Sequence, residues 1–199
     1  MATTNKDAAF GLKPIGKIGQ NRDNQGLSEY SIAANSSAIY QNDPVALLAT
    51  GFVGVSQSTT AGLLGSLNGV FYTDSSTSKP TFANHLEASN AATDIVGFVS
   101  DDPYERFEIQ SSSSLVIANI NLNARLATYA AGSSPNYISQ VEVNTATGGP
   151  MTTDSQPIRV LGVTRDDENN NKSNATTYAA NVNVVGMINN HQLKSTTGV

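Results

Sequence analysis

Two pairs of neighbouring carboxylates come nearest to a catalytic pattern in this chain. Asp101 and Asp102 precede a proline, and Asp166 and Asp167 begin a polar tract. Paired carboxylates can cleave glycosidic bonds, one as the acid and the other as base or nucleophile. Sugar sites usually also present aromatic platforms, and the chain contains no tryptophan. We therefore expect these carboxylates to lie in turns and not to form a hydrolase site.

Metal chemistry finds little support in the residue types and their spacing. His85 and His191 are the two histidines, far apart and without a second ligand at helical spacing, and cysteine is absent. We expect His191 to be a hydrogen-bonded residue at the end of the last strand. The run 166–171 carries oxygen ligands that could wrap Ca²⁺. It lacks the glycine of loop position 6 and has Thr177 at position 12, where glutamate closes such loops, so a solvated loop is the alternative that we favour.

Nucleophile and phosphate motifs are also missing from the sequence. The segment 65–69 resembles a serine elbow, but Ser66 stands one position early for Gly-x-Ser-x-Gly. Neither a Gly-x-x-x-x-Gly-Lys-Ser/Thr loop nor a Gly-x-Gly-x-x-Gly motif occurs. We expect a protein that is not an enzyme, with no catalytic, cofactor-binding or metal-binding residues.

The composition argues against nucleic-acid and membrane partners. Charged residues make up 14% of the chain, the net charge is −5, and the eleven basic residues are scattered, whereas DNA binding requires clustered Lys and Arg. No apolar signal segment follows Met1, and the longest aliphatic stretch, near 45–49, is far shorter than a membrane helix. We expect a soluble protein that is made in a cytoplasm.

Period-two alternation of apolar and polar residues is the main structural signal. It recurs at 28–32, 106–110, 140–144 and 181–184, and short apolar runs stand at 45–48, 52–55, 70–72, 95–99 and 158–163. Repeated short strands separated by turn residues predict an all-β fold, an antiparallel sandwich or a barrel-like domain. Ser, Thr and Asn carry most of the polarity, and these residues suit turns and β-surfaces.

Helical signals are few. We expect at most one or two short helices, near 117–124 and, more weakly, near 86–92, because asparagine interrupts the first of these patterns. Loops are expected at 73–84, 133–136, 145–150 and 166–176, where Ser, Gly, Pro and Asn gather.

Residues 1–26 differ from the rest of the chain and predict an extended N-terminal arm, followed by a β-rich domain over 27–199. Phe10, Leu12 and Ile15 are spaced among glycines and Pro14, a pattern that resists helix formation. We expect Phe10, Leu12, Pro14 and Ile15 to bind a neighbouring subunit, and the domain to fold without the arm. A frayed terminus is the alternative.

The chain resembles a family of tailed-bacteriophage virion proteins that are common in marine phages and described as capsid decoration (cement) or structural proteins. The stretches that carry the resemblance run almost from end to end, and the Asn-rich loop at 166–174 lies outside them. They are Ala8–Ile15, Asp43–Val45, Gly69–Asp74, Lys79–Phe82, Phe98–Pro103, Phe107–Gln110 and Ile188–Gln192.

The resemblance implies a location on the phage capsid and no catalysis, but it does not supply a fold. We expect a decoration protein on the outer capsid surface that binds the major capsid protein and stabilises the head. An acidic net charge suits that surface better than a DNA-facing wall. A homotrimer is the expected oligomer, with a dimer second, because capsid lattices offer many three-fold positions. A tail or baseplate component and a host-attachment adhesin are the alternatives.

Overall fold

The protein is built almost entirely from antiparallel strands in a computed structural model that describes residues 4–19, 26–146, 149–165 and 169–195. The helical elements of these ranges are two 3₁₀ turns, η1 (Ile117–Asn119) and η2 (Gln192–Lys194). The strands are β1 (Lys13–Lys17), β2 (Ser28–Ser31), β3 (Pro44–Leu47), β4 (Val53–Val55), β5 (Gly65–Thr73), β6 (Pro80–Ala83), β7 (Val96–Ser100), β8 (Glu105–Gln110), β9 (Leu115–Val116), β10 (Asn123–Ala124), β11 (Ile158–Val163), β12 (Lys172–Asn174), β13 (Thr177–Tyr178) and β14 (Asn183–Ile188).

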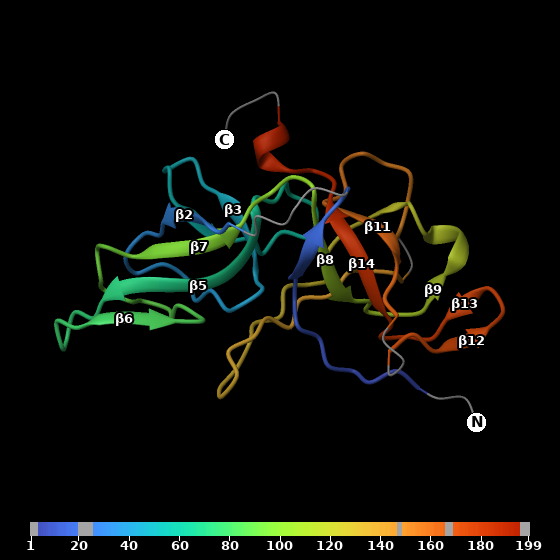
Figure 1. Cartoon of the computed structure of the whole chain (residues 1–199), viewed down its shortest axis with the longest axis horizontal. Coiled ribbons are helices and arrows are strands. Elements are labelled where there is room, and N and C mark those ends of the chain that lie inside the picture. The colour runs from blue at the N-terminus through green and yellow to red at the C-terminus, as the bar shows by residue number, and fades with distance from the viewer. Residues whose placement is uncertain (1–3, 20–25, 147–148, 166–168, 196–199) are drawn as a thin grey trace.

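The strands form three sheets, and the two large ones lie side by side in a sandwich-like arrangement (Figure 1). The first sheet has the order β1-β8-β14-β11-β10. The second sheet has the order β2-β7-β5-β3-β4, with β6 paired to the distal half of β5. A small third sheet joins β12, β13 and β9. The expected all-β class is thus confirmed.

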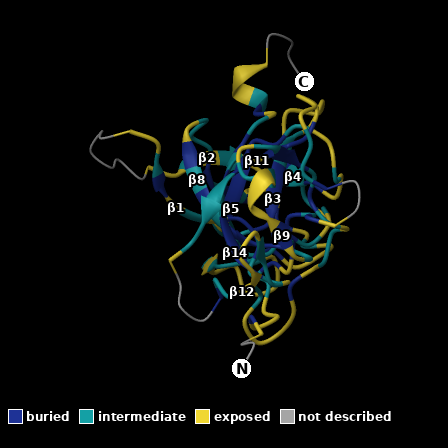
Figure 2. Ribbon diagram, turned by 90° about the vertical axis from the view of Figure 1, so that its right-hand side faces the viewer, coloured by how far each residue is buried: buried dark blue, intermediate teal, exposed yellow. Residues whose placement is uncertain are grey.

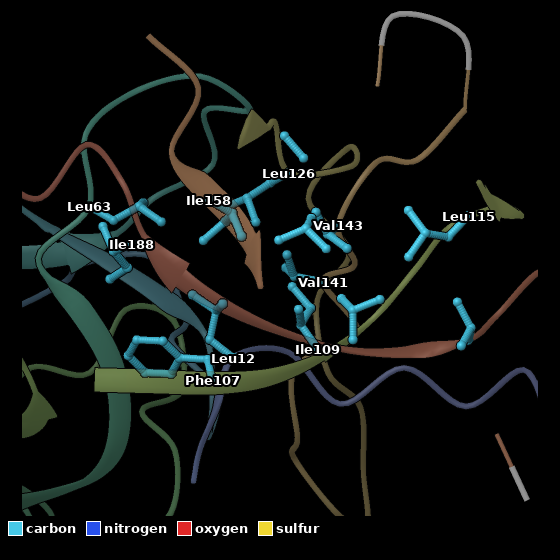
Figure 3. Close-up of a cluster of buried hydrophobic side chains, with 14 residues drawn as sticks. Leu12, Leu63, Phe107, Ile109, Leu115, Leu126, Val141, Val143, Ile158 and Ile188 are labelled. Atoms are coloured by element: carbon cyan, nitrogen blue, oxygen red, sulfur yellow. The ribbon is translucent and has the colours of Figure 1, made fainter. Parts of the chain in front are cut away.

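Each large sheet has its own hydrophobic core. Phe107, Ile109, Val160 and Val184 stand at the centre of the first core, part of which is drawn in Figure 3. Leu67, Val70, Val99 and further aliphatic side chains fill the second core. Much of the strand ribbon is buried, and the exposed residues gather in the connecting loops (Figure 2). The alternation seen in the sequence therefore marks the inward faces of both sheets.

Residues 4–19 lie along the body, which corrects the expected separation of an arm (1–26) from a domain (27–199). β1 is the edge strand of the first sheet and pairs with β8, with a bulge between Pro14 and Gly16. The Gly16 N–H donates to the buried carboxylate of Glu105 at 2.8 Å. Residues 1–3 and 20–25 of the expected arm lie outside the described ranges.

Leu12 connects the two large sheets. Its side chain is fully buried in the first core, beside Phe107 (Figure 3). Its main chain bonds to the second half of the molecule: its N–H donates to the Asn42 carbonyl at 2.8 Å, and its carbonyl accepts from the Ser66 hydroxyl at 2.6 Å. Leu12 thus joins the two halves: its side chain packs in the first core, and its main chain is hydrogen-bonded to the second half.

Gly11 allows this close approach. Its φ is +71°, and a Cβ placed there would lie 2.4 Å from the Asn42 carbonyl oxygen and 2.5 Å from the Ser139 Cβ. Any larger residue would have to push these groups apart in a backbone region that disfavours side chains. Glycine at this position is a requirement of the packing.

A second connection is a C-terminal clasp, which we define as residues 190–194. The Gln192 side chain accepts from the Leu47 N–H at 2.7 Å and donates to the Leu47 carbonyl at 3.2 Å, as a neighbouring strand would. Leu63 pairs with the clasp through its N–H and its carbonyl. His191 is 2% exposed, and its Nδ1 accepts the Leu193 N–H at 3.1 Å, so this nitrogen is unprotonated and the ring is neutral.

Burial lowers the pKa of His191, and Lys194 lowers it further. Asp101 and Asp102 act in the opposite direction, and burial outweighs them. At the other side of the junction, burial raises the pKa of Asp43, although its Oδ2 accepts from the Tyr40 N–H and the Tyr129 hydroxyl. The junction between the sheets thus holds a buried base and a buried acid.

Several local expectations differ from the structure. The helix expected at 117–124 is reduced to η1, and the segment 86–92 has a β-bridge from Leu86 to Ile39 and a turn at 88–89 in place of a helix. The alternation at 140–144 makes isolated bridges through Val143 to Ser111 and Leu126, although Val141 and Val143 are fully buried. Two expected loops, 73–84 and 166–176, contain β6 and β12. Neither helical element among the described residues is long or apolar enough to cross a membrane.

We predict that Leu12→Ala destabilises the protein by about 2–5 kcal/mol, because it leaves a cavity in the first core and loosens β1. Ile15→Ala, three residues further along the chain on β1 but with a 37% exposed side chain, should cost less than about 1 kcal/mol. Urea unfolding followed by circular dichroism measures both changes. Equal stabilities of Leu12→Ala and Ile15→Ala would show that residues 10–17 are not part of the core.

We predict that protonation of His191 destabilises the fold below about pH 6.5. The folded pKa lies below the unfolded one, so this contribution is present above the unfolded pKa and is lost as the pH falls. His191→Asn keeps an acceptor for the Leu193 N–H but does not titrate. Its melting temperature should fall less than that of the wild type between about pH 7.5 and pH 5.5.

His85→Asn, at the second histidine, is the matched control and should keep the wild-type dependence on pH. Identical pH profiles for the wild type and His191→Asn would refute the role of His191.

Candidate partner-binding surface

The four residues expected to bind a partner do not share one surface: Pro14 and Ile15 lie on β1, and Phe10 and Leu12 precede it. Phe10 is half-buried, and Pro14 is half-buried on β1. Ile15 is 37% exposed, whereas Leu12 is fully buried. The expectation that Leu12 anchors on a neighbouring subunit is therefore wrong in this conformation, because its side chain is part of the first core.

Phe10 and Pro14 line an open cleft of about 700 Å³ beside the free edge of β1. Leu27 and Ile138 add apolar surface, and the remaining lining is mainly amide, hydroxyl and charged groups. These are Lys13, Lys17, Gly26, Gln41, Asn42, Asn68, Ser100, Asp102 and Glu105. Phe10 and Ile138 also line a smaller neighbouring cleft of about 180 Å³, next to the 133–136 loop. Together the two clefts form a groove along residues 9–17.

The charges of this groove are balanced. Lys17 lies 2.7 Å from the Asp102 carboxylate, and Lys13 lies 3.2 Å from Glu108. The Lys17 ammonium holds the pKa of Asp102 below its usual range, assisted by the Tyr104 N–H. The lining carries two lysines, Lys13 and Lys17, and two carboxylates, those of Asp102 and Glu105. Because these charges balance, the groove suits an uncharged, partly apolar ligand better than an ion.

Asp101 and Asp102, the described members of the two carboxylate pairs, have structural partners. Asp101 accepts from the Ser28 hydroxyl at 2.9 Å and the Tyr30 hydroxyl at 2.6 Å, and this contact, together with burial, raises the pKa of Tyr30 above its ordinary value. Asp166 and Asp167 lie outside the described residues. Among the described side chains, no group of three His, Asp or Glu residues is placed to hold a metal ion.

Side-chain amides hold the segment before Phe10 by its main chain. The Lys6 N–H donates to Asn169 Oδ1 at 2.7 Å, and the Lys6 carbonyl accepts from Gln110 Nε2 at 2.9 Å. Gln110 Oε1 also accepts the Ala8 N–H at 3.0 Å. Gln110 is fully buried, whereas the side chains of Lys6 and Ala8 are exposed, so the body recognises the backbone of this segment and not its side chains.

Asn5 extends this amide network toward the third sheet. Its side chain donates to the Ala179 and Ala180 carbonyls and accepts the Asn171 N–H at 3.0 Å. Asn169 and Asn171 belong to the run that was considered as a Ca²⁺ loop, and in the structure both contact the N-terminal segment. These contacts could not be predicted from the sequence, because asparagines in a loop show no periodic pattern of apolar and polar residues.

A second exposed apolar surface lies on the second sheet and was not expected from the sequence. It is the aromatic stripe, which we define as Phe71, Phe82 and Phe98. The Phe71 and Phe82 ring centroids are 4.6 Å apart, and those of Phe82 and Phe98 are 6.4 Å apart. Phe82 is 72% exposed. The sequence signal that could have revealed it is the alternation in 80–83, which the serine-rich turn before it obscures.

Comparisons with known proteins do not add a family or a fold relative. No protein-family model, no curated protein and no solved structure matches the chain.

We predict that Gln110→Ala detaches the segment before Phe10. The Ala8 N–H would lose its side-chain partner, which costs about 1–3 kcal/mol. The Lys6 carbonyl would keep only its bond from Asn169 Nδ2 at 3.2 Å. Hydrogen exchange of a peptide covering residues 4–12 should accelerate by at least about tenfold more than that of β14. Gln140→Ala, at an exposed glutamine, is the control. Unchanged exchange at residues 4–12 in Gln110→Ala would contradict backbone recognition by this amide.

Proposed function

We propose that this chain is a non-enzymatic structural protein of a bacteriophage virion, a decoration protein that binds the capsid shell from outside. The observation that carries the proposal is the apolar surface beside β1, where Phe10 and Pro14 line the groove and Ile15 and Ile18 remain 37% and 45% exposed. An apolar surface of this kind on a soluble protein is characteristic of a protein–protein contact. The resemblance of the sequence to phage decoration proteins names the partner.

The occupant that we propose for the groove is an extended segment of the major capsid protein. An extended chain presents alternating side chains and backbone amides. Phe10, Leu27 and Ile138 would receive the apolar side chains, and Gln41 and Asn68 would bond to the amides. The balanced charges of the groove favour a neutral segment over a basic or acidic one.

The net charge and the polar composition support a location on the outer capsid surface. The net charge of −5 disfavours contact with packaged DNA. The neutral Ser, Thr and Asn surface allows many copies to lie close together without strong repulsion. Weak individual contacts suffice there, because a protein held by one contact has a high effective concentration at the site of the next.

We predict that Phe10→Ala weakens binding to empty capsids that lack this protein by about 10- to 100-fold, because an anchor of this size contributes about 1.5–3 kcal/mol when buried. The measurement is co-sedimentation of purified protein with such capsids over a range of concentrations. Phe52→Ala is the matched control, since Phe52 is also partly exposed but lies on the β3–β4 turn, away from the groove.

Equal affinities for the wild type and Phe10→Ala would exclude the groove as the contact. A wild-type protein that does not sediment with capsids at all would exclude the decoration function.

A further inference from the structure

The aromatic stripe lies on the face of the second sheet that points away from its core. Register places Phe71 opposite Phe82 on β6 and opposite Val96 on β7, and it places Phe98 opposite Gly69. Residues directly opposite each other in an antiparallel pair share a face. The intervening positions, Val70 and Val99 among them, point into the second core. The stripe is therefore the outer surface of three adjacent strands.

Charge is nearly absent from this face. In the paired register of β2, β7, β5 and β6, Glu29 is the one charged residue on the outer side, at the β2 edge opposite Phe98. Uncharged residues, Ser31 on β2 and Pro80 on β6, lie at the other edges of this face. A face whose paired positions carry one carboxylate, at the edge, has little means to select a charged partner, whereas it fits another flat and largely uncharged aromatic surface.

We propose that the aromatic stripe binds the aromatic stripe of a second copy of this chain, face to face across a two-fold axis. Each copy carries a net charge of −5, so two copies repel each other over most of their surface. The stripe is a neutral face through which they can approach. Two sheets stack about 10 Å apart, and at this spacing the projecting Phe82 ring of one copy can pack against the aromatic rings of the other.

The size of the stripe sets the strength of this contact. The stripe lies on the outer face of β2, β7, β5 and β6, and four strands about 4.8 Å apart and four residues long cover roughly 20 by 13 Å, a few hundred Å². A stable interface buries about 800 Å² on each partner. The pair should therefore be weak in dilute solution and should form at millimolar concentration, which is the range that tethering on a shared shell would supply.

This contact is separate from the groove beside β1, because none of the three stripe residues lines that groove. The self-contact rests on the proposed function in one respect: binding to the capsid is what would raise the local concentration of the chain enough for two copies to pair. A two-fold contact closes with two copies, so it favours a dimer over the trimer that the sequence analysis expects.

Sedimentation of the full chain from about 10 µM to about 1 mM tests the proposal. The average mass of the wild type should rise from 20.8 kDa toward twice that value, with most of the rise above about 0.1 mM. Phe82→Ser should shift this rise to at least about tenfold higher concentration. Because Phe82 is 72% exposed, this variant should keep the wild-type melting temperature.

Phe52→Ser, on the β3–β4 turn of the same sheet, is the matched control and should associate as the wild type does. A wild type that stays monomeric to about 1 mM would overturn the proposal, and so would association that Phe82→Ser leaves unchanged. Capsid binding by a protein that stays monomeric would reject the self-contact while leaving the proposed function intact.

Discussion

The position of Leu12 is the constraint on which the rest of the structure depends. Its side chain fills the first core, and its N–H and carbonyl bond to Asn42 and Ser66 of the second half. A main chain that leaves one core to cross beside another sheet must find partners for its polar groups. Gly11 permits the approach, and β1 continues it by pairing with β8. The first strand thus aligns both sheets and borders the groove that we propose as the capsid contact.

Amide and hydroxyl side chains replace strand pairing wherever the sheets end. Gln110 and Asn169 bind the main chain of residues 6 and 8, and Gln192 binds both polar groups of Leu47. These contacts explain why a chain with 14% charged residues is rich in neutral polar ones. A neutral amide can satisfy a buried peptide group without the desolvation cost of a charge. The same choice leaves the surface weakly charged, which suits close packing of many copies.

The fold class and most long strands could be predicted from the sequence, because burial of one sheet face imposes alternation. The run 158–163 coincides with β11, and the alternation at 28–32 and 106–110 marks β2 and β8. At 140–144 the same alternation marks two buried side chains, Val141 and Val143, but this segment makes only isolated bridges and does not pair with a strand along its length. The position of residues 4–19 along the body could not be predicted, because glycine and proline indicate extended backbone but do not say whether its partner lies on the same chain. The exposure of Phe82 was also not predicted, because the serine-rich turn obscures the alternation in 80–83 and an aromatic residue in a strand pattern ordinarily points inward.

The groove beside β1 and the aromatic stripe share no residue, so the two contacts that we propose are separate. A decoration protein needs such a pair of surfaces, one for the shell and one for a neighbour. The most direct test of the account is quantitative mass spectrometry of purified virions that encode this chain. The account predicts a copy number of the same order as that of the major capsid protein, with the chain lost from virions when Phe10 is replaced by alanine. A chain that is absent from virions, or present in the few copies typical of a tail tip or baseplate, would contradict it.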